Sequence, residues 1–528
     1  MKTSKKYYFF IIAVYLILYF IISLSYLEIF PFVHSDEPWL SGLTRNMMES
    51  KSIYCTETFF NIYPRFPHSI KVIFHLIQMP FILVFGYNIF AVRLVSLIFS
   101  IFTLILFYCI CTKIFKNGIY SVLLTILFSV NIQFIYASHF ARQESIIVFF
   151  FMLGFYHFLS PLGNKKINPH ILLGLIIGLS VGIHPNSFVI AVVFGLLYII
   201  DVFHKTKKFS HLITLIMTTG LTALIFVILS FIGDADFITH YTNFGETLGV
   251  SSSFYDKILT IPYYYKKLYL GISGTYYTPP IQVYLIIFAI ITISSILYLS
   301  VKYLGDKNSN KKESFSGLPI LRLLTCVIGI NIGFIIIGRY NQTNIIFIFP
   351  FFYLLTLALI CKVVDYRKEL IICFMGISII LSSYYTLKEV RLYTIYNYEA
   401  YLDELSVIPS DAKTLGNLNM EFYFDNDRLL DYRNLTFLEE NNIPFRDYIV
   451  DNNIEYIIYT EELDYIHRNP RWNILYGNDH YYDEINKYIE ENCALIHEFS
   501  NSLYGIRIPR YMMEYDWKIK IYKITTIS

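Results

Sequence analysis

Charged residues are scarce in this chain: of its 528 residues, 55% are hydrophobic and only 16% are Asp, Glu, Lys or Arg. An average soluble domain carries about 25% charged residues. The scarcity therefore argues against a soluble protein and for a chain that lies largely in lipid. The formal net charge is +2, which leaves neither the basic surface of a nucleic-acid-binding protein nor an acidic tail. We expect no nucleic-acid partner.

Two familiar sequence signals are also absent. The seven cysteines have no spacing typical of a zinc or redox site. The apolar run 7–30, which follows a basic N-terminus, is longer than the core of a signal peptide and lacks a small-residue cleavage site. Because a span needs about 20 mostly apolar residues, this run predicts a retained first transmembrane helix.

Long apolar runs predict about eleven transmembrane helices in total. Besides the first, they cover 89–112, 117–135, 145–160, 169–184, 187–203, 210–232, 281–302, 318–337, 343–362 and 369–386. The fold class is thus an α-helical polytopic membrane protein.

The apolar stretch 69–87 decides the orientation of everything after it. His68, Lys71, His75 and Gln78 recur at spacings of three and four, which places them on one helical face. This pattern predicts an interfacial helix that lies flat on the outer surface. With that helix outside, the lysine-rich loops all fall on the cytoplasmic side, as the positive-inside rule requires. We therefore expect a cytoplasmic N-terminus.

This topology divides the chain into two parts. Residues 1–386 form the transmembrane domain, with outer loops at 31–88 and 233–280. Residues 387–528 carry charges throughout, with short β-rich runs at 456–459 and 517–522 and a helical stretch at 482–491. They predict a small soluble α/β domain outside the cytoplasm.

An acidic pair follows the first span, in the segment Ser35-Asp36-Glu37-Pro38-Trp39. One interpretation is a well-formed helix N-terminus, since acids and a first-turn proline favour that end of a helix. The other is a catalytic general base, Asp36, with Glu37 as its support. The sequence alone leaves both open.

Further polar residues gather at the same outer boundary. They are His68, Lys71, Arg142, Glu144, His184 and Arg339. Singly, such residues at span ends serve as interfacial anchors. As a set of cations around a carboxylate, they suit an anionic lipid-linked phosphate better than a neutral solute.

The order of these motifs resembles a known family. The chain has the acidic pair in its first outer loop, then Phe66–Leu76, FG at 85–86 with AVRL at 91–94, HFARQE at 139–144, GIHPN at 182–186, and Arg339-Tyr340 before an apolar run ending at Pro350. This series is similar to the C-type membrane glycosyltransferases (GT-C fold), specifically the protein O-mannosyltransferases and lipid A aminoarabinose transferases. Where that family often has a doubled proline near His68, this chain has Ser69 and Ile70.

The resemblance implies a GT-C fold and a hexosyl or pentosyl transferase in the plasma (inner) membrane. The donor would be a polyprenyl-phosphate sugar, and the acceptor a hydroxyl on a lipid, glycan or protein, with inversion at the anomeric carbon. Asp36 would be the base and Glu37 its partner, while the outer cations would bind the phosphate. Some relatives place a divalent metal near the acidic pair; this sequence shows no clean ligand set, and His240 is the candidate ligand.

Two other classes remain open. A flippase or transporter of lipid-linked sugars would also span the membrane many times, although transporters usually concentrate ionisable residues near the midplane. A non-catalytic scaffold would account for the architecture but would give the Asp36 cluster no role.

Overall fold

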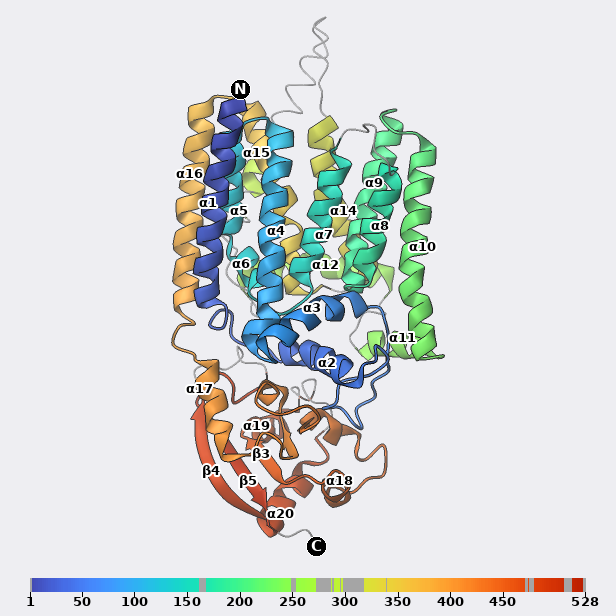
Figure 1. The fold of residues 1–528 in the computed structure, drawn as a ribbon, viewed down its shortest axis with the longest axis vertical. Helices are drawn as coiled ribbons and strands as arrows, with labels where there is room; N and C mark the ends of the chain where they lie inside the picture. Colours follow the sequence, from blue (N-terminus) through green and yellow to red (C-terminus); the bar gives the residue numbers. More distant parts are fainter. Residues whose placement is uncertain are drawn as a thin grey trace, which may run out of the picture.

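The structure is a computed structural model that describes residues 2–160, 168–247, 253–271, 318–338, 340–470, 479–507 and 515–525, together with residue 473 and short pieces between 286 and 297. It consists of a helical bundle with a smaller α/β domain at one end (Figure 1). The N-terminus lies at the opposite end of the bundle from that domain. We call the smaller domain the outer domain.

The bundle confirms the membrane class of the chain. Within the described part of the chain, seven helical segments are long and apolar enough to cross a bilayer. They correspond to α1 (Lys2–Tyr26), α4 (Ile89–Phe115), η1 with α9 (Pro185–Ser187, Phe188–Phe203), α10 (Phe209–Gly233), α14 (Leu318–Ile337), η2 with α15 (Gln342–Phe347, Phe349–Val363) and α16 (Lys368–Arg391). The shorter apolar helices α7 (Glu144–Phe158) and α8 (Pro169–Val181) stand in the bundle beside them. The expected span 281–302 falls mostly outside the described residues.

The expected span at 117–135 is broken into two helices. The structure has α5 (Gly118–Ser129) and α6 (Ile132–Ser138), bent by 67° at the break between them. Asn131 causes the break, because its side-chain oxygen caps α6 by accepting from the N–H groups of Gln133 and Phe134. Its amide also donates to the Tyr353 hydroxyl at 2.9 Å, which anchors the bend inside the bundle.

Two helices of the first outer loop lie across the end of the bundle that faces the outer domain (Figure 1). They are α2 (Asp36–Ser50) and α3 (Val72–Phe85). The prediction of an interfacial helix here is confirmed, but α3 begins only at Val72, so His68 and Lys71 precede it. The polar face of α3 packs on α2, where Thr44 Oγ1 lies 2.8 Å from His75 Nδ1 and 2.6 Å from Gln78 Oε1.

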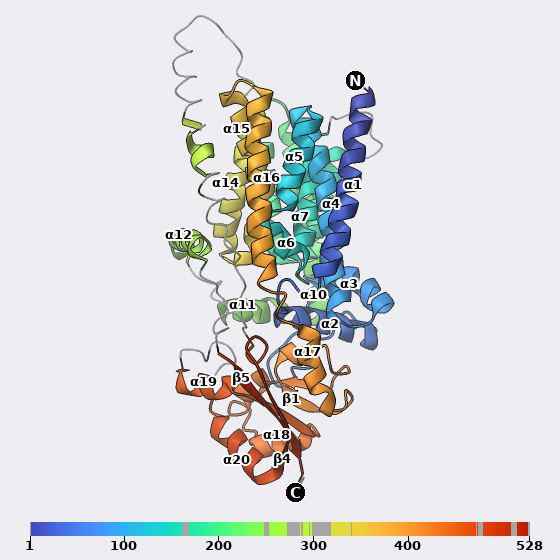
Figure 2. The same cartoon turned by 90° about the vertical axis from the view of Figure 1, so that its left-hand side faces the viewer.

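Loop 233–280 contains α11 (Phe237–Thr247) and α12 (Phe254–Leu270) in its described part. Figure 2 shows α11 between the bundle and the outer domain, and α12 beside the bundle. In α12, Tyr264 is buried and its hydroxyl donates to the Asn341 carbonyl oxygen at 3.3 Å. The neighbouring Tyr265 hydroxyl donates to Asn331 Oδ1 of α14 at 2.6 Å. The two tyrosines therefore attach α12 to the residue that caps η2 and to α14.

The outer domain begins beyond α16 and is built on a five-stranded sheet of order β2-β1-β3-β5-β4. Its strands are β1 (Thr414–Gly416), β2 (Leu429–Asp431), β3 (Tyr456–Thr460), β4 (Cys493–Asn501) and β5 (Trp517–Ile524). The first three strands are parallel, and β5 runs antiparallel to β3 and β4. Between and around them lie α17 (Tyr398–Asp403), η3 (Glu404–Val407), η4 (Leu418–Met420), η5 (Tyr432–Phe437), α18 (Phe445–Asp451), α19 (Glu462–Arg468) and α20 (Tyr482–Asn492). The predicted strands at 456–459 and 517–522 and the helix at 482–491 are confirmed.

Candidate active site

Asp36 and Glu37 form the start of α2, and their carboxylates differ in burial. Glu37 is fully buried, and both of its oxygens bind the guanidinium of Arg93 on α4, at 2.7 and 2.8 Å. It also accepts from the backbone N–H of His34 at 3.0 Å and of Ala141 at 2.9 Å. Arg93 is equally buried and donates its remaining Nη1 to the Leu27 carbonyl oxygen at 2.9 Å. Glu37 is therefore a fixed joint between α2 and the bundle.

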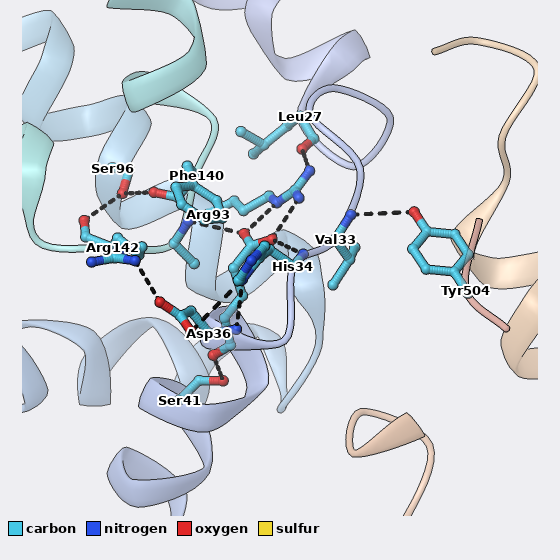
Figure 3. Close-up of polar contacts among 12 residues, drawn as sticks. Leu27, Val33, His34, Asp36, Ser41, Arg93, Ser96, Phe140, Arg142 and Tyr504 are labelled. Carbon is cyan, nitrogen blue, oxygen red and sulfur yellow. Dashed lines mark hydrogen bonds and ion pairs between the residues drawn. The ribbon is translucent and has the colours of Figure 1, made fainter. Parts of the chain in front are cut away.

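Asp36 differs because its side chain is 24% exposed. Its Oδ2 pairs with Arg142 Nη1, from the turn between α6 and α7, as Figure 3 shows. Its backbone N–H donates to His34 Nδ1 at 3.0 Å, which holds the first turn of α2. Among the carboxylates of this cluster, Asp36 is the one that a solute can reach.

Arg142 links Asp36 to a second acid. Its Nη2 lies 3.2 Å from Glu144 Oε1, and both side chains are only 3% exposed. Glu144 in turn accepts from Thr343 Oγ1 at 2.7 Å, so η2 of the bundle is tied to the same cluster. A guanidinium shared by two carboxylates is strongly held in position, and it supplies positive charge beside the accessible Asp36.

The other predicted site residues are more scattered. His184 is buried and accepts from the Asn186 N–H at 3.0 Å, and Asn186 Nδ2 reaches Asn344 Oδ1 of η2 at 3.3 Å. Lys71 lies in the turn before α3. Arg339 lies outside the described residues, so its position in this cluster is untested.

His68 lies near the rings of Phe237 and Tyr241, with ring centroids 6.5 and 6.0 Å away. Burial lowers the pKa of His68 to about 3, and the charges of Lys71 and Arg65 act in the same direction. The imidazole is therefore neutral at neutral pH. It can offer a hydrogen bond to a ligand but no positive charge.

Several polar residues near the pair were not predicted as site residues. Arg93 was noted only within the AVRL motif at 91–94. Glu57 is buried, accepts two hydrogen bonds from Arg65 at 2.8 and 2.9 Å, and accepts from Trp39 Nε1 at 2.7 Å. Burial raises the pKa of Glu57, but the Arg65 charge and hydrogen bonds outweigh it and bring the pKa to about 2. The only sequence feature that relates Glu57 to Arg65 is their separation of eight residues.

No group of three or more His, Cys, Asp or Glu side chains that could hold a metal ion occurs among the described residues. The candidate ligand His240 instead binds Asp234 Oδ2 through Nδ1 at 2.7 Å and stacks on Phe66 with ring centroids 3.5 Å apart. These contacts hold His240 against Asp234 and Phe66 and do not fit a metal ligand at the acidic pair.

Comparisons with known proteins point in one direction. Residues 71–241 match the family model described as dolichyl-phosphate-mannose-protein mannosyltransferase. The undecaprenyl phosphate-alpha-4-amino-4-deoxy-L-arabinose arabinosyl transferase of Wigglesworthia glossinidia brevipalpis is 28% identical over 186 residues, or 34% of this chain. That match spans only 31% of the relative's length.

Two solved structures share the fold along most of the chain. ArnT from Cupriavidus metallidurans bound to undecaprenyl phosphate has a TM-score of 0.53 at 10% identity, covering 98% of both chains. The archaeal oligosaccharyltransferase AglB from Archaeoglobus fulgidus, in complex with an inhibitory peptide and a dolichol-phosphate, has a TM-score of 0.51 at 13% identity, covering 85% of this chain and 69% of that one. At these identities the likeness concerns the fold.

Proposed function

Since this chain is a GT-C protein of the protein mannosyltransferase and aminoarabinose transferase family, we propose that it transfers a sugar from a polyprenyl-phosphate donor to a hydroxyl acceptor. The relatives supply the chemical class, because the curated relative is named for an undecaprenyl phosphate sugar and the two structural relatives hold undecaprenyl phosphate and dolichol-phosphate. The transferred sugar is a hexose or a pentose.

One observation carries the proposal: Asp36 is accessible, whereas the charged side chains that surround it are buried. Glu37, Arg142 and Glu144 are at most 3% exposed, and Arg142 pairs with Asp36. An accessible carboxylate can accept the proton of an attacking hydroxyl.

In the proposed reaction the acceptor hydroxyl attacks the anomeric carbon as Asp36 takes its proton. The bond between that carbon and the phosphate oxygen breaks, and the polyprenyl phosphate leaves with the electron pair. A single displacement inverts the configuration of the sugar. Arg142 stabilises the charge that grows on the leaving phosphate. Lys71 and Arg339 are its proposed helpers, and His68 and His184 are proposed hydrogen-bonding groups.

We also infer the orientation of the chain from its charges. Lys113 and Lys116 at the end of α4, 205–208 after α9, and 362–368 after α15 all lie at the end of the bundle remote from the outer domain. The positive-inside rule places that end in the cytoplasm and Asp36 outside, in a plasma or inner membrane. Alkaline phosphatase fused to the C-terminus should then be active in cells, and inactive enzyme there would contradict the orientation.

The decisive experiment follows release of radiolabelled sugar from a panel of polyprenyl-phosphate sugars by the purified chain in lipid. Asp36→Asn should abolish release while Asp411→Asn, an exposed acid of the outer domain, leaves it unchanged. If no donor loses its sugar and the lipid moves between the leaflets of a liposome, the transferase proposal fails and the flippase alternative replaces it.

A further inference from the structure

One helix of the long outer loop carries an exposed apolar face. Figure 2 shows α12 end-on, so this helix lies crosswise to the upright helices of the bundle. On its inner side Tyr264 is buried against α14, with its ring centroid 6.0 Å from that of Phe334. On its opposite side Tyr255, Leu259 and Tyr263 recur every four residues and are 69%, 57% and 53% exposed. These three side chains form a continuous apolar stripe along α12.

Two lysines stand at the C-terminal end of this stripe. Lys266 is exposed and follows Tyr263 by three residues, which places it on the same face of the helix. Lys267 Nζ lies 4.5 Å from the centre of the Tyr263 ring. Within the described part of the chain, neither lysine forms an ion pair with an acidic side chain. The single acid of α12, Asp256, lies at the other end of the helix, where Ser253 Oγ donates to it at 2.6 Å.

An ordinary lipid-facing surface does not explain this combination. A helix that only contacts lipid tails needs neither lysines nor tyrosine hydroxyls, and the basic side chains of membrane proteins concentrate on the cytoplasmic side. A helix C-terminus attracts cations, but that effect gives no reason for the stripe beside them. A basic, aromatic helix in the membrane plane is typical of the boundary between acyl chains and headgroups, where rings enter the apolar edge and lysines reach phosphates.

The position of α12 matters to the candidate active site because hydrogen bonds connect the two. Tyr264 donates to the carbonyl oxygen of Asn341 at 3.3 Å. Asn341 caps η2, since its Oδ1 accepts from the Thr343 N–H at 3.1 Å. The Thr343 hydroxyl then donates to Glu144 at 2.7 Å, and Glu144 belongs to the cluster around Asp36. A shift of α12 would therefore disturb η2 and the residues that hold Asp36.

We propose that α12 binds anionic phospholipid of the outer leaflet and that this contact keeps η2 in the position that the active site needs. Tyr255, Leu259 and Tyr263 enter the edge of the bilayer, and Lys266 and Lys267 bind lipid phosphates. The occupant is bulk phospholipid rather than the sugar donor, because the stripe faces away from the bundle whereas a donor phosphate must reach the candidate active site. The effect on turnover rests on the proposed function and orientation, but the lipid contact does not depend on the transfer reaction.

Quenching of a tryptophan placed on the stripe tests the contact with lipid. The full chain and its Leu259→Trp variant are placed in nanodiscs of phosphatidylcholine and phosphatidylglycerol, with or without bromine on the acyl chains near the headgroup. Brominated lipid should quench most of the emission that the variant adds to that of the parent. Val450→Trp, at an exposed position of the outer domain, is the control, and its added emission should not be quenched. Equal behaviour of the two variants overturns the proposal.

Hydrogen exchange tests the preference for anionic lipid. The backbone amides of α12 should exchange about tenfold or more slowly when phosphatidylglycerol is added to phosphatidylcholine, because each lysine is attracted to the anionic surface. The double variant Lys266→Gln with Lys267→Gln should lose this slowing, whereas the corresponding double arginine variant should keep it. Lys487→Gln, which changes an exposed lysine of the outer domain, should behave as the parent does. Exchange that ignores phosphatidylglycerol, or that ignores both lysines, overturns the proposal.

Sugar release in the same nanodiscs tests the connection to the active site. Phosphatidylglycerol should raise release about fivefold or more in the parent and in the double arginine variant, but not in the double glutamine variant. Release that ignores phosphatidylglycerol although α12 binds it overturns that connection.

Two further outcomes separate this inference from its alternatives. If undecaprenyl phosphate protects α12 from exchange more strongly than an equal amount of phosphatidylglycerol, the helix binds the donor and the phospholipid proposal fails. The lipid contact and the transferase function also fail separately. Lipid-dependent protection of α12 without sugar release from any donor sinks only the transferase, and sugar release with an α12 that ignores lipid sinks only this inference.

Discussion

Asp36 and Glu37 are adjacent in sequence, but their side chains differ in burial and in hydrogen bonding. Glu37 satisfies its oxygens with the Arg93 guanidinium and two backbone N–H groups inside the protein. Asp36 has its carboxylate at the edge of the cluster, 24% exposed. A buried ion pair of this kind is costly to break because the partner that remains keeps its charge in a medium that solvates it poorly.

Replacement of either member of the buried pair should therefore act on stability. Glu37→Gln leaves Arg93 uncompensated and should lower the free energy of unfolding by about 3 to 5 kcal/mol. Asp36→Asn should leave the melting temperature within a few degrees while abolishing sugar release. Thermal melting and donor turnover, measured side by side, check both. Equal losses of stability in the two variants would refute the division of roles.

A pH effect is expected from Glu421, at the contact between the outer domain and α2. Burial raises the pKa of Glu421 to about 8, although Arg45 Nη1 lies 3.7 Å from its Oε1 and opposes the shift. The unfolded side chain ionises near pH 4.5, so between that pH and about 8 the folded state binds the extra proton. Stability should thus fall as pH rises through this window, by a few kcal/mol at roughly 1.4 kcal/mol per pKa unit, and then level off.

Glu421→Gln mimics the protonated side chain and should remove most of this slope. Melting temperatures of the parent and the variant from pH 5 to 9 provide the measurement. Glu439→Gln, which changes an exposed acid of the same domain, is the matched control. A slope that survives in Glu421→Gln would assign the effect to another group.

The sequence predicted part of the residue-level site. Asp36, Arg142 and Glu144 were expected at one boundary from the topology, and the structure joins them. Arg93 was missed because an arginine at the start of a span reads as an anchor. The placement of Arg433 and Arg507 over the ring of Trp39 was not predicted. The two arginines lie nearly 400 residues or more after Trp39, and periodicity carries no information on contacts at that separation.

Among the elements, α8 and α10 pack through glycines. Gly174, Gly178 and the following Gly182 recur every four residues and face Thr218, Thr222 and Phe226 of α10. Small residues at this spacing let two helices approach closely in a membrane. Added side chains on this face would meet backbone as well as side-chain atoms: a Cβ on Gly178 would lie 2.9 Å from the Thr219 carbonyl oxygen.

Gly178→Ala should consequently push α8 from α10 and destabilise the protein by about 1 to 3 kcal/mol. Gly195→Ala on α9 is the control, because a Cβ there has no atom within 4 Å. It should be neutral or slightly stabilising, since alanine favours a helix. Melting temperatures in nanodiscs test this prediction. Equal melting temperatures of the two variants would mean that close contact of α8 and α10 does not contribute to stability.

For the secondary-structure elements, the sequence predicted the positions of the helices better than their ends. Apolar length identified α4, α10 and α16, because a bilayer demands such runs. It did not reveal the break at Asn131, since asparagine in an apolar run signals a cap only when its side chain is seen to bind the next turn. It also placed His68 and Lys71 on a helix that begins only at Val72.

On the scale of the whole molecule, the side chain of Asn434 makes several of the hydrogen bonds that join the outer domain to the first outer loop. Asn434 Oδ1 accepts from the N–H groups of Asn61, Ile62 and Tyr63 at 3.1, 3.2 and 3.1 Å. Its Nδ2 donates to the Phe59 carbonyl oxygen at 2.9 Å. Asn434 is fully buried, so these bonds have no water to replace them.

Asn434→Ala should free the loop 59–63, because four hydrogen bonds across the junction disappear and each buried group left unpaired costs about 1 to 3 kcal/mol. Hydrogen exchange of this loop should rise at least tenfold, with little change in the transmembrane helices. Asn441→Ala, an exposed asparagine of the same domain, should not alter exchange at 59–63. Unchanged exchange in Asn434→Ala would show that other contacts suffice.

The way α2 is held has an evolutionary consequence. Arg93 and Arg142 of the bundle bind the carboxylates in its first turn. The ring of Trp39, one turn later, lies next to Arg433 and Arg507 of the outer domain. The contacts that hold the Asp36 carboxylate and those that surround the Trp39 ring thus come from different parts of the chain. Sequence changes in the outer domain could therefore alter the surroundings of Trp39 while the contacts that fix Asp36 stay the same.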